Sequence, residues 1–270
     1  MAIQTPSAET TAKLTPNDAT ILSALFDPES LSSSVSAATN TARIDSSLPS
    51  LPQIPDSELA DLEIKQKEMI ARLSANESQI EEVLSIKKEL DEAISRHSNY
   101  PSAYLNRAQV NRISLESRPG GSDAIFSSEN LAQNGGRVDE LFTDLSAAIK
   151  VSSPKSQNDP VSPFQARILR SAHSHRAYLY LKASETLFPS PFSSDTDSTS
   201  GEVALLNALE GLSKTDMEDL ASKDFSKAAW YGDEVAREMS VRTNPYARMC
   251  GAIVRNAIRE ERKEAGWEGY

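Results

Sequence analysis

The chain has 270 residues and a formal net charge of -11 at pH 7, with a pI of about 4.9. This acidic balance argues against binding to nucleic acid or to an anionic membrane surface, both of which favour a basic face. Its single cysteine, Cys250, excludes an internal disulfide. Because no membrane-spanning run and no signal peptide is evident, we expect a soluble protein of the cytoplasm, with the nucleus as the alternative.

The first 56 residues differ in composition from the rest of the chain. They are rich in Ser, Thr, Ala and Pro and end in the proline-spaced run SSLPSLPQIPDSE. Such a segment buries too little apolar surface to offset its ordering entropy, so we expect 1–56 to be a mostly disordered arm. Within it, NDATILSALFDPESL predicts a short helix near 18–26, because its apolar residues share one side and Pro28 follows. This helix is either transient or a docking segment for the protein's own groove or for a partner.

From Ser57 onwards the sequence predicts helices and no strand. The first repeat-sized unit consists almost wholly of strong helix formers with helical apolar spacing, and Asn76 divides it into two antiparallel helices. Further helices are expected at about 101–116, 138–151, 163–184, 203–210, 215–231, 233–240 and 245–264. We therefore expect an all-α domain over 57–264, with inserted loops near 117–137, 152–162 and 185–202 and a tail at 265–270.

Two of these helices carry matching side-chain patterns. The segments AYLNRAQVNRI and AHSHRAYLYLK align, so that Tyr104, Arg107 and Ala108 correspond to His173, Arg176 and Ala177. The helices that follow share a second pattern at spacings of four and three residues, found in Leu141, Leu145 and Ala148, in Ala221, Phe225 and Ala228, and in Ile86, Leu90 and Ala93. The chain thereby resembles the tetratricopeptide repeat, in which small residues let paired helices cross closely and bulky neighbours fill the remaining volume. We expect three repeats, at about 57–98, 101–151 and 163–231.

The alignment also identifies the residues that should pack the repeats together. They are the small and bulky members of the two patterns, namely Tyr104, Ala108, Leu145, Ala148, Ala177, Tyr180, Ala221, Phe225 and Ala228. Tyr180 fills the aromatic position of the later repeat, and Asn111 takes that position in the earlier one. After the last repeat, the helix beginning at Asn244-Pro245 is expected to cap the solenoid with a covered apolar stripe, because terminal units must shield the core. The stripe consists of Tyr246, Met249, Cys250, Ile253 and Ala257, and Cys250 is expected to be a buried, unreactive thiol.

Three short motifs in order resemble the tetratricopeptide repeat protein 36 family. They are NDATILSALFDP in the arm, NRAQ at 106–109 after a Pro-Ser-Ala-Tyr lead, and NPYA at the start of the last helix. The resemblance covers most of residues 17–260 apart from the three insertions. It implies an all-α, tetratricopeptide-like solenoid of helical hairpins with about three repeats and C-terminal capping helices.

The same resemblance implies a non-enzymatic adaptor that acts through protein contacts. Family members are associated with Hsp70-type chaperones and with regulation of tyrosine catabolism, so the expected partner is such a chaperone, a tyrosine-catabolic enzyme or its regulator. Chaperone-binding tetratricopeptide domains commonly hold an acidic tail in a dicarboxylate clamp. Asn106 matches one clamp position, but Ser171 and His175 occupy others and the first repeat lacks a clear Lys–Asn pair. We therefore do not expect a full clamp.

No residue pattern predicts a catalytic, cofactor or metal site. His173 and His175 are two positions apart on one helix and point in different directions, whereas a helical metal site prefers a spacing of four. His173 is expected to pack at a bulky position and His175 to line the groove. The acidic pairs near helix starts are explained by the helix dipole.

The first helix of each repeat lines the concave face in this fold, which selects the candidate peptide-binding residues. These are Asn106, Gln109, Arg112, His175, Tyr178 and Lys182. Each of them belongs either to a binding groove or to an ordinary solvated helix face, and the serine-rich insertion SPFSSDTDSTSG is either a spacer or a loop controlled by phosphorylation. Two other functions stay open, a structural subunit whose groove holds its own arm and a small-molecule-binding or catalytic helical domain with a deep polar pocket.

Overall fold

The computed structural model describes residues 41–75, 80–117, 121–188 and 206–264. In chain order, these ranges form α4 (Asp56–Ala75), α5 (Ile80–Arg96), α6 (Pro101–Glu116), the 3-10 helix η1 (Gly121–Phe126), α7 (Ser128–Ser152), α8 (Pro163–Leu187), α9 (Lys214–Trp230), α10 (Glu234–Thr243) and α11 (Pro245–Glu264). Apart from an isolated parallel bridge between Ile44 and Val161, the described residues outside the helices form turns and loops.

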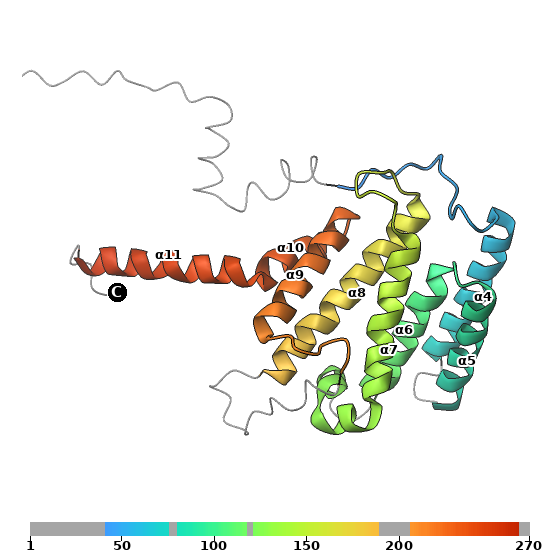
Figure 1. Cartoon of the computed structure of the whole chain (residues 1–270), viewed down its shortest axis with the longest axis horizontal. Coiled ribbons are helices and arrows are strands. Elements are labelled where there is room, and N and C mark those ends of the chain that lie inside the picture. Colours follow the sequence, from blue (N-terminus) through green and yellow to red (C-terminus); the bar gives the residue numbers. More distant parts are fainter. Residues whose placement is uncertain (1–40, 76–79, 118–120, 189–205, 265–270) are drawn as a thin grey trace, which may run out of the picture. The chain divides into compact units, whose positions relative to one another are not determined.

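Successive helices pack side by side (Figure 1). Each helix from α4 to α9 contacts the next, and α4 also contacts α6 while α6 contacts α8. The first helices of successive pairs therefore lie against one another, as they do in a stacked repeat. The prediction of an all-α, tetratricopeptide-like solenoid is confirmed, with the pairs α4–α5, α6–α7 and α8–α9 followed by α10 and α11.

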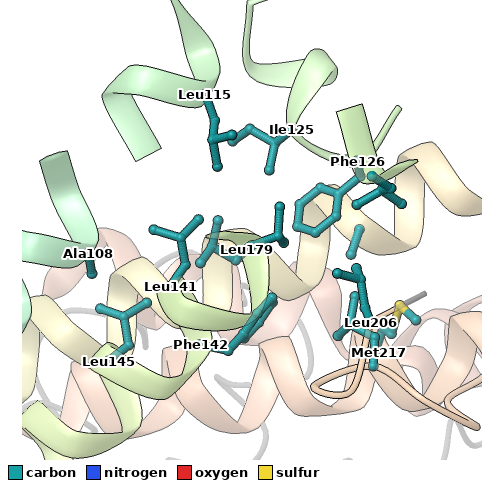
Figure 2. Packing of buried hydrophobic residues seen from close by; sticks show 14 of the residues in the cluster. Ala108, Leu115, Ile125, Phe126, Leu141, Phe142, Leu145, Leu179, Leu206 and Met217 are labelled. Atoms are coloured by element: carbon teal, nitrogen blue, oxygen red, sulfur yellow. The ribbon is translucent and has the colours of Figure 1, made fainter. Parts of the chain in front are cut away.

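Small buried residues allow the two helices of a pair to approach closely. The alanines that align between repeats have no exposed surface: Ala108, Ala148, Ala177, Ala221 and Ala228. Leu145 is also fully buried and Phe225 nearly so, while Tyr104 and Tyr180 pack half-buried against the core. Figure 2 shows Ala108 and Leu145 in the same cluster as Leu141 and Phe142.

Ala108→Leu is expected to lower the free energy of unfolding by about 1–3 kcal/mol, because the larger side chain enters a crossing that is already filled. Urea denaturation at constant pH measures the change. Ala60→Leu is the matched control, since Ala60 lies on the exposed side of α4. Equal effects of the two substitutions would show that the close crossing does not depend on Ala108.

The aligned arginines each bind an aspartate of the following helix. Arg107 donates from Nε and Nη2 to Asp144 of α7, and Arg176 donates from the same two nitrogens to Asp224 of α9. The Nε–Oδ2 distances are 2.9 Å and 2.6 Å. Both aspartates are almost fully buried. A two-point ion pair therefore joins the helices of each of these repeats, which explains the arginine in the repeat pattern.

Two segments differ from the expected helix boundaries. α7 begins at Ser128, inside the loop expected at 117–137, because the Ser127 side chain caps it and a non-helical residue at Asn134 (φ -134, ψ 17) joins its two halves. The helix expected at 203–210 is wrong over its described part, since residues 207–211 form turns. Leu206 and Leu209 are nevertheless fully buried, so this segment serves the core without being helical.

The last part of the expected arm packs against the helices. The backbone N–H of Ala42 donates to the carbonyl of Trp230 at 2.7 Å, and that of Asp45 donates to Val161 at 2.9 Å. Leu51 and Ile54 are buried against the first repeat. The packed region therefore begins before residue 57, because these apolar side chains pack against the helices of the first repeat. The helix expected near 18–26 and most of the insertion at 185–202 lie outside the described residues.

The apolar stripe of α11 is exposed, so the expectation that it would be covered is wrong. Tyr246, Met249 and Ile253 are 63%, 55% and 60% exposed, and Cys250 is exposed as well. α10 covers α9 instead, with Ala236 buried and Ser222 Oγ donating to the carbonyl of Ser240. The last helix therefore extends away from the packed helices (Figure 1).

Candidate functional site

α6 and α8 form a groove along the face of the first helices, here called the α6–α8 groove. It is lined by Leu105, Asn106, Gln109, Arg112, Arg167, Ser171, Ser174, His175 and Tyr178. Five of the six predicted groove residues are in this set. The sixth, Lys182, lies farther along α8 and its Nζ is 3.3 Å from Glu185 Oε2. Arg167, Ser171 and Ser174 extend the groove toward the start of α8 and were not among the predicted binding residues.

Helix register brings these residues together. Asn106, Gln109 and Arg112 follow a spacing of three on α6, and Ser171, His175 and Tyr178 follow spacings of four and three on α8, so each set occupies one helix face. Pro at the first position starts both helices, and Ser162 forms a capping box with Gln165 at the start of α8. Local capping and periodicity thus position the polar side chains, and contact between α6 and α8 faces them toward one another.

Arg112 is the centre of a polar cluster in the groove. Its Cζ lies 5.5 Å from the centroid of the Tyr178 ring, and its Nη1 is 3.5 Å from Glu116 Oε1. Among the described residues, neither Arg112 Nε nor His175 Nε2 has a hydrogen-bond partner, although both atoms are buried. Burial, and then the positive charge of Arg112, lowers the pKa of His175 to about 3. His175 is therefore neutral near pH 7, and the positive charge of the groove comes from its arginines.

An apolar pocket adjoins the polar groove. It lies between the first two repeats and is lined by Gln66, Met69, Ile70, Leu73, Ile86, Leu90, Asn106, Gln109, Val110 and Ile113. Asn106 and Gln109 line both hollows, and Asn106 Nδ2 donates to Gln66 Oε1 at 2.6 Å. Ile70 is 44% exposed, so the apolar lining of this pocket is open to solvent on one side. The site therefore combines an apolar end with a polar, cationic end.

His173 lies outside the groove, although it is only two residues from His175. It is buried, and its Nδ1 lies 2.8 Å from Asp224 Oδ1. Its ring stacks on that of Tyr231, with 6.3 Å between the two ring centroids. No three His, Cys, Asp or Glu side chains gather in a metal-binding arrangement within the described residues. None of the helices described here combines the length and apolarity needed to cross a membrane.

Stacked helix pairs with alanines at their crossings and a groove along the first helices define a helical-repeat protein of the tetratricopeptide type. The chain is 37% identical over 268 residues to "L-tyrosine degradation gene cluster protein hmgX" of Aspergillus fumigatus, covering 97% of this chain and 98% of that protein. It is 26% identical over 253 residues to "Tetratricopeptide repeat protein 36 homolog" of Drosophila pseudoobscura pseudoobscura, covering 91% and 95% of the two chains. The chain belongs to the tetratricopeptide repeat protein 36 family. No family model and no solved structure matches it.

Proposed function

We propose that this protein is a non-enzymatic adaptor that binds a segment of a partner protein in the α6–α8 groove. The observation that supports this proposal is the convergence of polar residues from two repeats on one open groove. The relative from Aspergillus fumigatus is named for an L-tyrosine degradation gene cluster and is similar over nearly its whole length. We therefore propose that the partner is an enzyme of tyrosine degradation or its regulator, and that the complex forms in the cytoplasm.

The chemistry of the groove favours an extended peptide with an apolar side chain next to an acidic one. The apolar pocket accepts the first, and Arg112 and Arg167 attract the second. Asn106 and Gln109 lie between them and carry amide groups, which donate and accept hydrogen bonds and so suit a peptide backbone. Arg167 Nη2 is 2.7 Å from Glu63 Oε2, whereas Arg112 Nη1 is 3.5 Å from Glu116 Oε1, so Arg112 has the longer ion pair of the two.

A Hsp70-type chaperone is a second candidate partner by family resemblance. A dicarboxylate clamp would need cations near the third-repeat positions that hold Ser171 and the neutral His175. Binding of an acidic chaperone tail would therefore depend on Arg112 and Arg167 and is expected to be weaker than binding of a segment that also fills the apolar pocket.

The test is affinity capture from a lysate of the protein's own cells, comparing the full chain with a Gln109→Ala, Arg112→Gln variant. Lys150→Gln is the control, because Lys150 is exposed on α7 and lies outside the groove. Captured proteins are identified by mass spectrometry, and the enzyme found is then titrated in purified form. We expect the Kd between the enzyme and the groove variant to be higher than for the full chain by about tenfold or more, equivalent to about 1.4 kcal/mol. The Kd between the enzyme and the Lys150→Gln control should be unchanged.

Retention of the same enzyme by the groove variant would place binding elsewhere on the chain. Retention of Hsp70 alone, lost in the variant, would support the chaperone as the partner instead. Capture of no protein by any of the three would contradict the adaptor proposal and favour a structural role.

A further inference from the structure

α11 carries a wide apolar face that no part of the described chain covers. Tyr246, Met249 and Ile253 share one side of the helix at spacings of three and four, and Val254 and Ile258 widen it. These five side chains are between 45% and 63% exposed, the highest being Tyr246 at 63%. The helix has 20 residues, a length of about 30 Å at 1.5 Å per residue. Since most helical stability in proteins comes from packing an amphipathic face, this helix is expected to have a partner.

Charged residues are distributed unevenly around α11. Arg255 and Arg259 lie on the side opposite the apolar face and are exposed. Glu260 and Glu261, also exposed, lie on the apolar side near the C-terminal end of the helix. An acidic protein groove or an anionic membrane that covered the apolar face would therefore meet two carboxylates, which repel it.

A second copy of α11 avoids this repulsion when the two helices run antiparallel. Glu260 and Glu261 of one copy then lie beside the start of the other helix, near Tyr246, where the positive end of the helix dipole favours carboxylates. Asn244 Oδ1 already accepts hydrogen bonds from the N–H groups of Tyr246 and Ala247 at this end, so the attraction comes from the dipole. In a parallel pair, the same carboxylates would meet their own counterparts. The basic sides face solvent in either arrangement.

We infer that two copies of this protein form a homodimer by antiparallel pairing of the apolar faces of α11. Such an interface is isologous, because each copy contributes the same residues around a two-fold axis near Ile253. The dimer leaves the α6–α8 groove of each copy untouched, because the groove is built from other helices. This inference is therefore independent of the proposed adaptor function.

Sedimentation equilibrium of the full chain across the micromolar range tests the dimer. We expect a mass of twice 29.4 kDa for the parent and a single 29.4 kDa for Ile253→Glu. Met249→Glu should act in the same way, and neither residue is buried, so circular dichroism should show a folded repeat domain in both variants. Arg255→Glu is the matched control on the opposite side and should remain dimeric.

The orientation is tested with the double variant Glu260→Gln, Glu261→Gln. Antiparallel pairing predicts that the dimer dissociation constant rises about threefold or more, whereas parallel pairing predicts that it falls. A monomeric parent, a dimeric Ile253→Glu variant or a tighter double variant would each overturn the inference. A monomeric parent that sediments with vesicles of phosphatidylserine and phosphatidylcholine would identify the apolar face as a membrane-binding surface instead.

Discussion

Asp224→Ala is expected to lower the free energy of unfolding by about 3–5 kcal/mol, because it leaves buried charge without a partner. Asp224 is 6% exposed and accepts hydrogen bonds from Arg176, while His173 Nδ1 lies 2.8 Å from Oδ1. Burial raises the pKa of Asp224, but the bonds to Arg176 and His173 outweigh burial and hold the pKa below its usual value. The ionised carboxylate is therefore the form that the fold stabilises.

Urea denaturation near pH 7 measures this loss. Asp219→Ala is the control on the same helix, because Asp219 pairs with the exposed Lys223 and should change stability little. The double variant Arg176→Met, Asp224→Leu removes both charges and is expected to recover most of the lost stability. If Asp224→Ala is no more damaging than the control, the ion pair is not a stabilising element of the third repeat.

Lowering the pH from 6.5 to 4.5 is expected to reduce the free energy of unfolding by about 2–3 kcal/mol through His175 alone. Burial, and then Arg112, lowers the pKa of His175 in the folded chain to about 3, whereas the unfolded chain has its ordinary value near 6.5. Below pH 6.5 the unfolded state binds a proton that the folded state does not bind. Stability is therefore lost as the pH falls, until the folded pKa is reached.

The measurement is the free energy of unfolding in urea at a series of pH values for the parent and for His175→Gln. The variant should show a flatter slope over this interval by up to about 1.4 kcal/mol per pH unit. Carboxylates with a lowered pKa, such as Asp224 and Glu63, also stabilise the fold less as the pH falls. Their contribution to the slope is the same in the parent and in the variant, so it cancels in the comparison. Parallel slopes for the two proteins would contradict burial of a neutral His175.

Much of the candidate site could be predicted from the sequence, because helical periodicity and the repeat alignment select one face of α6 and one face of α8. Five predicted residues accordingly line one groove. Lys182 was predicted on the same face, but it lies beyond the end of the groove. Helical periodicity shows which face of a helix a residue occupies, and it does not show where along the helix a groove ends. The apolar pocket depends on how closely α4 approaches α6, which no local pattern reports.

The sequence by itself determined most of the helices and the small residues at their crossings, but it missed the start of α7 at Ser128 and the turns at 207–211. The expected bounds of 101–116 and 245–264 match α6 and α11, because Pro at the first turn and capping side chains act within a few residues.

Only the tertiary structure decided which surfaces are covered. Leu51 packs against other residues and is buried, whereas Ile253 has no such packing in the described chain and is exposed. Likewise, the partners Asp144 and Asp224 lie 37 and 48 residues from their arginines. Side-chain patterns report an apolar or charged face, but its partner is set by long-range packing of the whole chain.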